Sequence, residues 1–127
     1  MKQLFTLLES STFLQFPDLY KSLGIQETRF QSTRQFNKAI VRTAPDIMLA
    51  EFIYGFGNNY AGINISNLDV SLRALQRYAP HTKIILLADK LEHSHISKLE
   101  ELFRIDASLT LPVSAKDIET AIKELDI

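Results

Sequence analysis

Short apolar runs alternate with amphipathic segments from one end of this chain to the other. Each run is long enough for a buried strand, and most are followed by apolar residues at helical spacing. We predict strands over residues 4–8, 28–31, 47–50, 83–88 and 107–110, of which 28–31 is the weakest.

The amphipathic segments predict a helix after each strand. Their expected ranges are 15–24, 33–43, from Ser66 or Asn67 to the residue before Pro80, 94–103, and a segment after Ser114. Ser114 and Asp117 resemble a capping box, in which each side chain accepts a hydrogen bond from the other residue's backbone N–H. The apolar positions expected to face the core are Phe13, Phe16, Tyr20, Leu23, Phe36, Ala39, Ile40, Leu68, Leu72, Leu75, Tyr78, Ile96, Leu99, Phe103, Ile118, Ala121, Ile122 and Leu125.

The strict alternation of strands and helices predicts an α/β domain of three layers. A parallel sheet would be covered by helices on both faces and joined by right-handed crossovers. Continuous apolar runs such as 47–50 and 83–88 are typical of strands that are buried on both faces. We treat residues 1–127 as one domain. Ligands of such folds sit at the carboxyl ends of the strands, here residues 9–11, 51–56, 88–90 and 111–112.

Composition and charge limit the classes of partner. The 127 residues include 14 basic and 15 acidic side chains, a net charge of −1 that does not indicate nucleic-acid binding. The absence of cysteine excludes disulfides and thiolate sites and fits a reducing cytoplasm. The first apolar run ends at Glu9 without a cleavage site, and no run approaches the roughly 20 residues of a membrane span. We therefore expect a soluble, cytoplasmic domain that binds no membrane.

Three segments resemble, in chain order, parts of the receiver domain, the phosphoacceptor module of bacterial response regulators. Pro45–Glu51 resembles its third strand, Lys83–Ala88 its fourth, and Arg104–Pro112 its glycine-alanine-aspartate segment leading into lysine-proline. The resemblance covers nearly the whole chain and is stronger after Ala44. It implies a doubly wound, flavodoxin-like (βα)5 fold with strand order 2-1-3-4-5. It also implies a cis bond between Leu111 and Pro112.

The acidic positions depart from the receiver pattern. Glu51 stands where the family has its phosphorylated aspartate, and the acidic pair that holds Mg²⁺ is reduced to Glu9, followed by Ser10. Glu51 could mimic a phosphorylated aspartate, or it could be an ordinary carboxylate at the edge of a loop. Glu9 and Glu51 could bind a divalent cation weakly, or both could be solvated, since Mg²⁺ needs several hard oxygen ligands.

The remaining motif positions have lost their polar chemistry. Leu87, next to Ala88, matches the hydroxyl residue that ends the fourth strand of receivers, and Leu111, before Pro112, matches the lysine. Phosphoryl transfer depends on metal and cationic stabilisation of the developing charge. The resemblance therefore implies a degenerate site, and we expect no enzymatic activity, metal or other cofactor.

Residues 52–66 predict a long loop with an unusual content of aromatics. Phe52, Tyr54, Phe56 and Tyr60 could form a binding surface close to the site, or they could fold back onto the domain. The glycines at 55–57 lack the lysine and hydroxyl residue of a P-loop. His93 and His95, with Glu92 nearby, do not complete a matched set of metal ligands. We interpret these three residues as solvated or capping residues.

Our leading hypothesis is a receiver-like regulatory module that works without phosphorylation. It would bind a partner protein, an output domain fused to it, or a second copy through its last helices and fifth strand. Two other interpretations stay open. One is a sensor of a small molecule or nucleotide that uses the carboxyl edge of the sheet as a pocket. The other is a residual phosphoacceptor that uses an unexpected residue.

Overall fold

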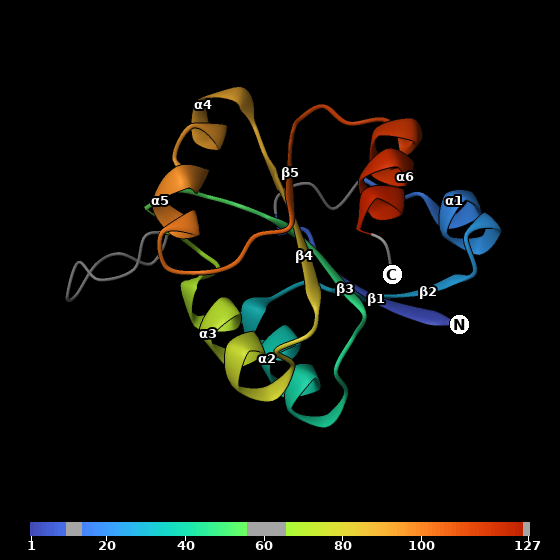
Figure 1. Ribbon diagram of the computed structural model, residues 1–127, viewed down its shortest axis with the longest axis horizontal. Helices are drawn as coiled ribbons and strands as arrows, with labels where there is room; N and C mark the ends of the chain where they lie inside the picture. Colours follow the sequence, from blue (N-terminus) through green and yellow to red (C-terminus); the bar gives the residue numbers. More distant parts are fainter. Residues whose placement is uncertain (10–13, 56–65, 126–127) are drawn as a thin grey trace.

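The computed structural model describes residues 1–9, 14–55 and 66–125, which form one parallel sheet with helices on both faces (Figure 1). The strands are β1 Lys2–Leu7, β2 Ile25–Phe30, β3 Ile47–Glu51, β4 Lys83–Ala88 and β5 Ala107–Thr110. The helices are α1 Pro17–Ser22, α2 Thr33–Arg42, α3 Asp69–Tyr78, α4 Lys90–His93, α5 Ile96–Glu100 and α6 Ala115–Glu124. In the described part of the chain, no helix is both long and apolar enough to cross a membrane.

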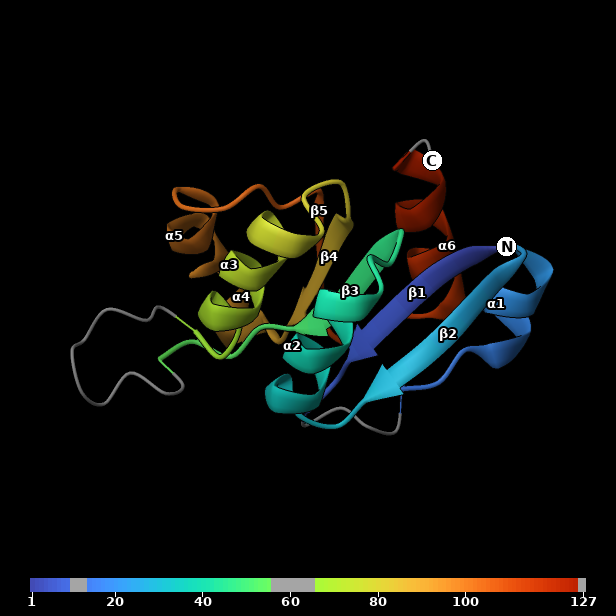
Figure 2. The ribbon, with the colours of Figure 1, turned by 90° about the horizontal axis from the view of Figure 1, so that it is seen from below.

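The sheet has the strand order β2-β1-β3-β4-β5, and all four pairings are parallel (Figure 2). This order confirms the α/β fold class and the topology that the resemblance implied. In the register, Leu4 lies opposite Ile47, and Glu51 lies opposite Leu87. All carboxyl ends of the strands therefore meet at one edge of the sheet.

The two faces of the sheet bury separate core clusters. Helices α2, α3 and α5 cover one face with Phe36, Ile40, Leu72, Leu75, Ile96 and Leu99, and α1 and α6 cover the other with Tyr20, Ile118 and Ile122 (Figure 1). Alternate residues of the central strands enter opposite clusters, as the period of two in a strand requires. Met48 and Ala50 belong to the first cluster, while Ile47 and Leu49 belong to the second.

Two local signals in the sequence form the predicted structures. Ser114 and Asp117 make the capping box at the start of α6, with the Asp117 N–H donating to Ser114 Oγ over 3.2 Å and the Ser114 N–H donating to Asp117 Oδ2 over 2.9 Å. Gly24 follows α1 with a φ of 70°, in the left-handed region that favours glycine. The chain can therefore turn directly from α1 into β2.

Two of the predicted elements and one predicted core residue are wrong in detail. β2 begins at Ile25, earlier than expected, because it pairs with all of β1 from Lys2 onward. The helix expected over 94–103 is the shorter α5, Ile96–Glu100. The loop expected before it contains α4, which starts at Lys90 because the Asp89 carboxylate accepts the N–H groups of Leu91 and Glu92. The Tyr78 side chain is 43% exposed and does not face the core, which Leu72, Leu75 and Ala79 fill instead.

Candidate functional site at the carboxyl edge of the sheet

The segments expected to carry chemistry meet at the carboxyl edge of the sheet. Glu51 is the last residue of β3, Ala88 is the last of β4, and Glu9 lies two residues beyond β1. The Leu111 N–H donates to the Ala88 carbonyl over 2.8 Å, and this bond joins the end of β4 to the segment after β5. Ser10, the neighbour of Glu9, lies outside the described residues.

Asn67, for which the sequence predicts only a helix cap, connects these segments. Its side-chain N–H donates to Glu9 Oε1 over 2.8 Å and to the Glu51 carbonyl over 2.9 Å. Its Oδ1 accepts the Ile53 N–H over 2.8 Å, and its own backbone N–H donates to the Ile53 carbonyl over 3.1 Å. One nearly buried amide thus holds the ends of β1 and β3 in place.

The Glu51 side chain is almost buried, with 7% of the residue exposed. It ends β3 opposite Leu87, and the next backbone N–H, that of Phe52, donates to the Leu87 carbonyl over 2.7 Å. Glu51 is thus anchored by the sheet itself and not by a flexible loop. This placement disfavours the interpretation of Glu51 as an ordinary solvated carboxylate.

The apolar residues at this edge, Leu87, Ala88 and Leu111, belong to the core or pack against it. Leu87 is 1% exposed and lies in the core cluster under α6, and the half-buried Leu111 packs against the same cluster. Ala88 is fully buried on the other face. The peptide bond between Leu111 and Pro112 is cis, which confirms the geometry that the resemblance implied. Neither Leu87 nor Leu111, the two positions that the resemblance matches to polar receiver residues, has a side chain that can form a hydrogen bond.

The residues at this edge do not fit the Mg²⁺ that receivers use. Glu9 already accepts a hydrogen bond from Asn67, and the neighbouring Asp69 carboxylate accepts the backbone N–H and the hydroxyl of Ser66, each over 2.8 Å. Within residues 1–9, 14–55 and 66–125, no three acidic, histidine or cysteine side chains gather closely enough to hold a metal. A hard divalent cation prefers more oxygen ligands than Glu9 and Glu51 supply.

The beginning of the long loop packs against α4 and α5. The Tyr54 ring stacks on the His95 ring with 3.8 Å between centroids, and Lys98 Nζ donates to the Tyr54 hydroxyl over 3.0 Å. The Tyr54 N–H donates to Glu92 Oε2 over 2.9 Å. Glu92 and His95, for which the sequence predicts a solvated or capping role, therefore anchor the start of this loop to the helices.

The aromatic residues of the loop divide between the core and the surface. Phe52 is 1% exposed and belongs to the core cluster under α2 and α3, so it folds back onto the domain. Tyr54 is 40% exposed and leaves part of its ring accessible beside His95. Phe56 and Tyr60 lie outside the described residues.

Comparison with known proteins identifies the fold through structure and not through sequence. No protein-family model matches the chain, and no curated protein matches it. A response regulator receiver domain from Clostridium thermocellum is 21% identical, with a TM-score of 0.69 over 98% of this chain and 93% of that one. A CheY-like receiver domain protein from Methanospirillum hungatei JF-1 is 13% identical, with a TM-score of 0.75 over 98% and 93%.

A longer protein aligns with this chain over about half of its own length. The response regulator DrrB, a Thermotoga maritima OmpR/PhoB homologue, is 17% identical with a TM-score of 0.73, and the alignment covers 98% of this chain but 52% of that one. These likenesses agree with the parallel strand order of the sheet. The chain therefore has the fold of the response-regulator receiver domain.

Proposed function

We propose that this chain is a receiver-like signalling module that works without phosphorylation and acts through protein–protein contacts, not catalysis. The observation that carries this proposal is the position of Leu111, which packs against the core cluster where the receiver resemblance places a lysine. An apolar side chain cannot pair with a phosphoryl group. Leu87, which the resemblance matches to the receiver's hydroxyl residue, has no hydroxyl, so two of the groups that would stabilise transferred charge are missing together.

The partner is a protein or an output domain joined to this one. DrrB extends well beyond the aligned region, and a structure of the response regulator RcsB with DNA, aligned over 60% of that chain, is also longer than this domain. Such chains suggest that a receiver fold passes its signal to a second domain. We further propose that the module works in the cytoplasm and that DNA binding, where it occurs, belongs to another domain.

A second copy of the chain is the other candidate partner. The surface of α5, β5 and α6 carries exposed or half-exposed charges of both signs, including Lys98, Glu101, Arg104, Lys116 and Glu119. Mixed charges allow the self-complementary pairing that a two-fold dimer requires. Sedimentation of the chain over a range of concentrations distinguishes a dimer from a monomer.

An amide NMR titration with Mg²⁺ and beryllofluoride, a mimic of the phosphoryl group, tests the proposal. We expect the resonances of Glu9, Glu51 and Ala88 to stay in place at every concentration. The DrrB receiver domain, whose structure is described as activated by BeF₃, is the positive control. Saturable shifts at these three residues in our chain would show a working phosphoacceptor site and would overturn phosphorylation independence.

A further inference from the structure

Helices α2 and α3 lie side by side on one face of the sheet and present only basic charges to solvent (Figures 1 and 2). The hydroxyl of Ser71 on α3 donates to Asn37 Oδ1 on α2 over 2.7 Å, and this bond marks the seam between the two helices. The exposed basic residues are Arg34, Lys38 and Arg42 on α2 and Arg73 and Arg77 on α3. The one acidic residue of these helices, Asp69, is fully buried.

The absence of acidic residues extends beyond the two helices. Residues 33–45 and 70–88 contain no aspartate or glutamate. The two helices hold five of the 14 basic and one of the 15 acidic side chains, so the rest of the chain has nine basic against fourteen acidic side chains. A chain with a net charge of −1 therefore has one strongly basic face.

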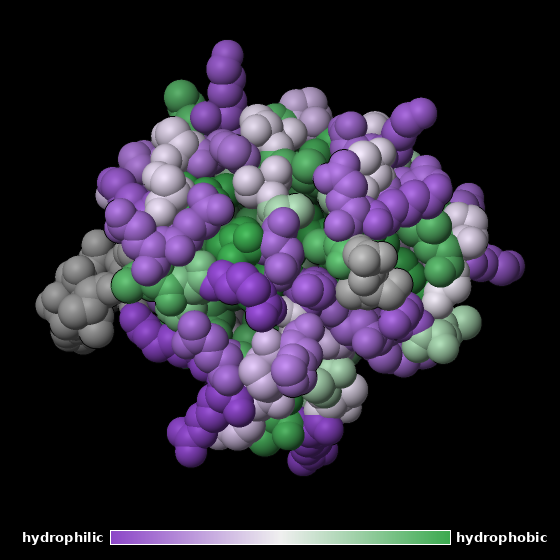
Figure 3. Space-filling model, in the orientation of Figure 1, coloured by the Kyte–Doolittle hydropathy of each residue, from purple (hydrophilic) through white to green (hydrophobic). Residues whose placement is uncertain are grey.

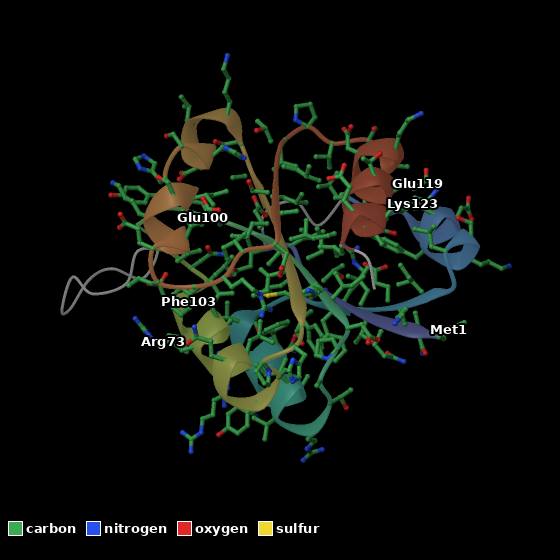
Figure 4. The ribbon with its side chains drawn as sticks, viewed as in Figure 1. Met1, Arg73, Glu100, Phe103, Glu119 and Lys123 are labelled. Carbon is green, nitrogen blue, oxygen red and sulfur yellow. The ribbon has the colours of Figure 1, made fainter. Side chains whose placement is uncertain are left out.

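The five basic side chains have no carboxylate partner among the residues that the structure describes. Arg73 lies over the Phe103 ring at 5.9 Å (Figure 4). Arg77 lies over the Tyr78 ring at 5.4 Å, so both guanidinium groups rest on aromatic faces. Elsewhere, Arg104 pairs with Asp106 over 3.4 Å and Lys123 with Glu119 over 2.9 Å. The positive charge of the α2–α3 face is thus not neutralised within the described part of the domain.

Exposed apolar side chains lie among these charges. Val41 follows Asn37 by one helical turn and Tyr78 follows Ser71 by two, so both continue the seam. Their exposed fractions are 56% and 43%, and Val70 on the outer side of α3 is 55% exposed. Lys38, Val41 and Arg42 also line a hollow on α2. Figure 3 shows hydrophilic side chains projecting where α2 and α3 lie, with hydrophobic atoms between them.

We propose that this α2–α3 face binds an acidic protein segment that also carries apolar side chains. Carboxylates of the segment would pair with the five basic residues, and its apolar side chains would cover Val41, Val70 and Tyr78. Arginine and tyrosine around an apolar centre are the composition of protein-binding surfaces. This inference rests on the proposed protein-interaction function and assigns its partner a surface away from the carboxyl edge of the sheet.

Other polyanions fit this face less well. A nucleic-acid duplex offers phosphates to the basic residues, but its backbone has no large apolar side groups to cover Val41 and Tyr78. An anionic membrane requires a broad apolar face that enters the lipid, and here three separate apolar side chains lie among charges. An acidic, partly apolar polypeptide matches both features of the surface.

The direct test is an amide NMR titration of the full chain with a synthetic peptide of glutamate, leucine and phenylalanine. We expect saturable shifts confined to residues 33–43 and 69–79, and weaker binding as salt is raised because the charge pairs are exposed. The same peptide with glutamine in place of glutamate should not bind. Shifts that are absent or spread over the whole surface overturn the proposal, as does equal binding of the glutamine peptide.

Charge-neutralising variants locate the surface. The triple variant Arg34→Gln, Lys38→Gln, Arg42→Gln should weaken peptide affinity roughly tenfold, as expected from three exposed charge pairs. The matched control is Lys21→Gln, Lys90→Gln, Lys116→Gln, which removes three exposed positive charges from α1, α4 and α6 and should leave the affinity unchanged. An equal loss of peptide affinity in both triple variants would overturn the assignment of the binding site to this face.

Two further titrations decide the class of partner. A DNA duplex and vesicles that contain phosphatidylserine are each added to the same chain, and either one binding this face more tightly than the peptide overturns the proposal. The beryllofluoride experiment is independent of this result. If beryllofluoride shifts the Glu51 resonance while the peptide still binds, the proposed function is contradicted. If beryllofluoride leaves Glu51 unchanged and the peptide does not bind, only the assignment of the α2–α3 face is contradicted.

Discussion

At the scale of single residues, Asn67 shows how one amide fixes a site. Its side chain bonds to Glu9, Glu51 and Ile53 over distances of 2.8 to 2.9 Å, and the residue is 8% exposed. Asn67→Ala should lower the free energy of unfolding by about 1–3 kcal/mol, because buried partners lose their hydrogen bonds. Urea denaturation measures the loss. The exposed Gln26→Ala is the control, and an equal effect in both variants would contradict the role of Asn67.

Tyr20 makes the free energy of unfolding fall as the pH becomes alkaline. Burial raises the pKa of its phenol above the usual range, the nearby Glu27 carboxylate adds to this shift, and Arg29 opposes it. Because the unfolded chain ionises its tyrosines near pH ~10, the neutral phenol stabilises the fold fully below that pH. This contribution is lost as the pH rises toward the pKa of the folded state.

The Tyr20→Phe variant tests this pH dependence. Its free energy of unfolding should fall less steeply than that of the parent chain between pH ~9 and ~11, because phenylalanine has no proton to lose. Tyr78→Phe, at an exposed position, should keep the slope of the parent chain. Urea denaturation at several pH values measures both slopes. The same slope in Tyr20→Phe and in the parent chain would show that Tyr20 does not contribute.

At the scale of elements, the sequence alone predicts a strand or helix correctly wherever its local pattern agrees with the tertiary packing. Residues 47–50 and 83–88 are apolar at every position but the first, Lys83, because both faces of the central strands are buried, so their pattern predicts β3 and β4 directly. The Ser114 capping box marks the start of α6 without any knowledge of the fold. The carboxyl ends of the predicted strands 4–8, 47–50 and 107–110 then place Glu9, Glu51 and Leu111 at one edge before any coordinates are known.

The elements that the sequence did not predict depend on contacts between distant segments. The break between α4 and α5 falls where His95 stacks on Tyr54, 41 positions earlier in the numbering, and no local pattern reports that contact. Asn67 resembles an ordinary helix cap until its bonds to Glu9 and Glu51 are seen. The basic α2–α3 face likewise needs two helices that the sequence separates by more than 25 residues. The one sequence signal that points to Asn67 is its position directly after the asparagine-containing loop that follows the predicted strand 47–50.

At the scale of the whole molecule, one sheet separates two cores. Side chains from α2, α3 and α5 fill the first cluster, and those from α1 and α6 fill the second (Figure 1). The sheet itself is common to both, since alternate residues of β3 and β4 enter opposite clusters. We therefore expect one cooperative unfolding transition in which neither face unfolds before the other.

Core substitutions on opposite faces should act independently. Ile40→Val and Ile118→Val, in different clusters, should each lower the free energy of unfolding by about 0.5–1.5 kcal/mol. The double variant should lose the sum of the two within about 0.5 kcal/mol, because the side chains share no packing partner across the sheet. Ile118→Val with Ile122→Val, one turn apart on α6, is the contrasting pair and should depart from additivity, since both side chains pack in the same cluster. Strong coupling between Ile40 and Ile118 in urea denaturation would mean that the sheet transmits strain between its faces and does not isolate them.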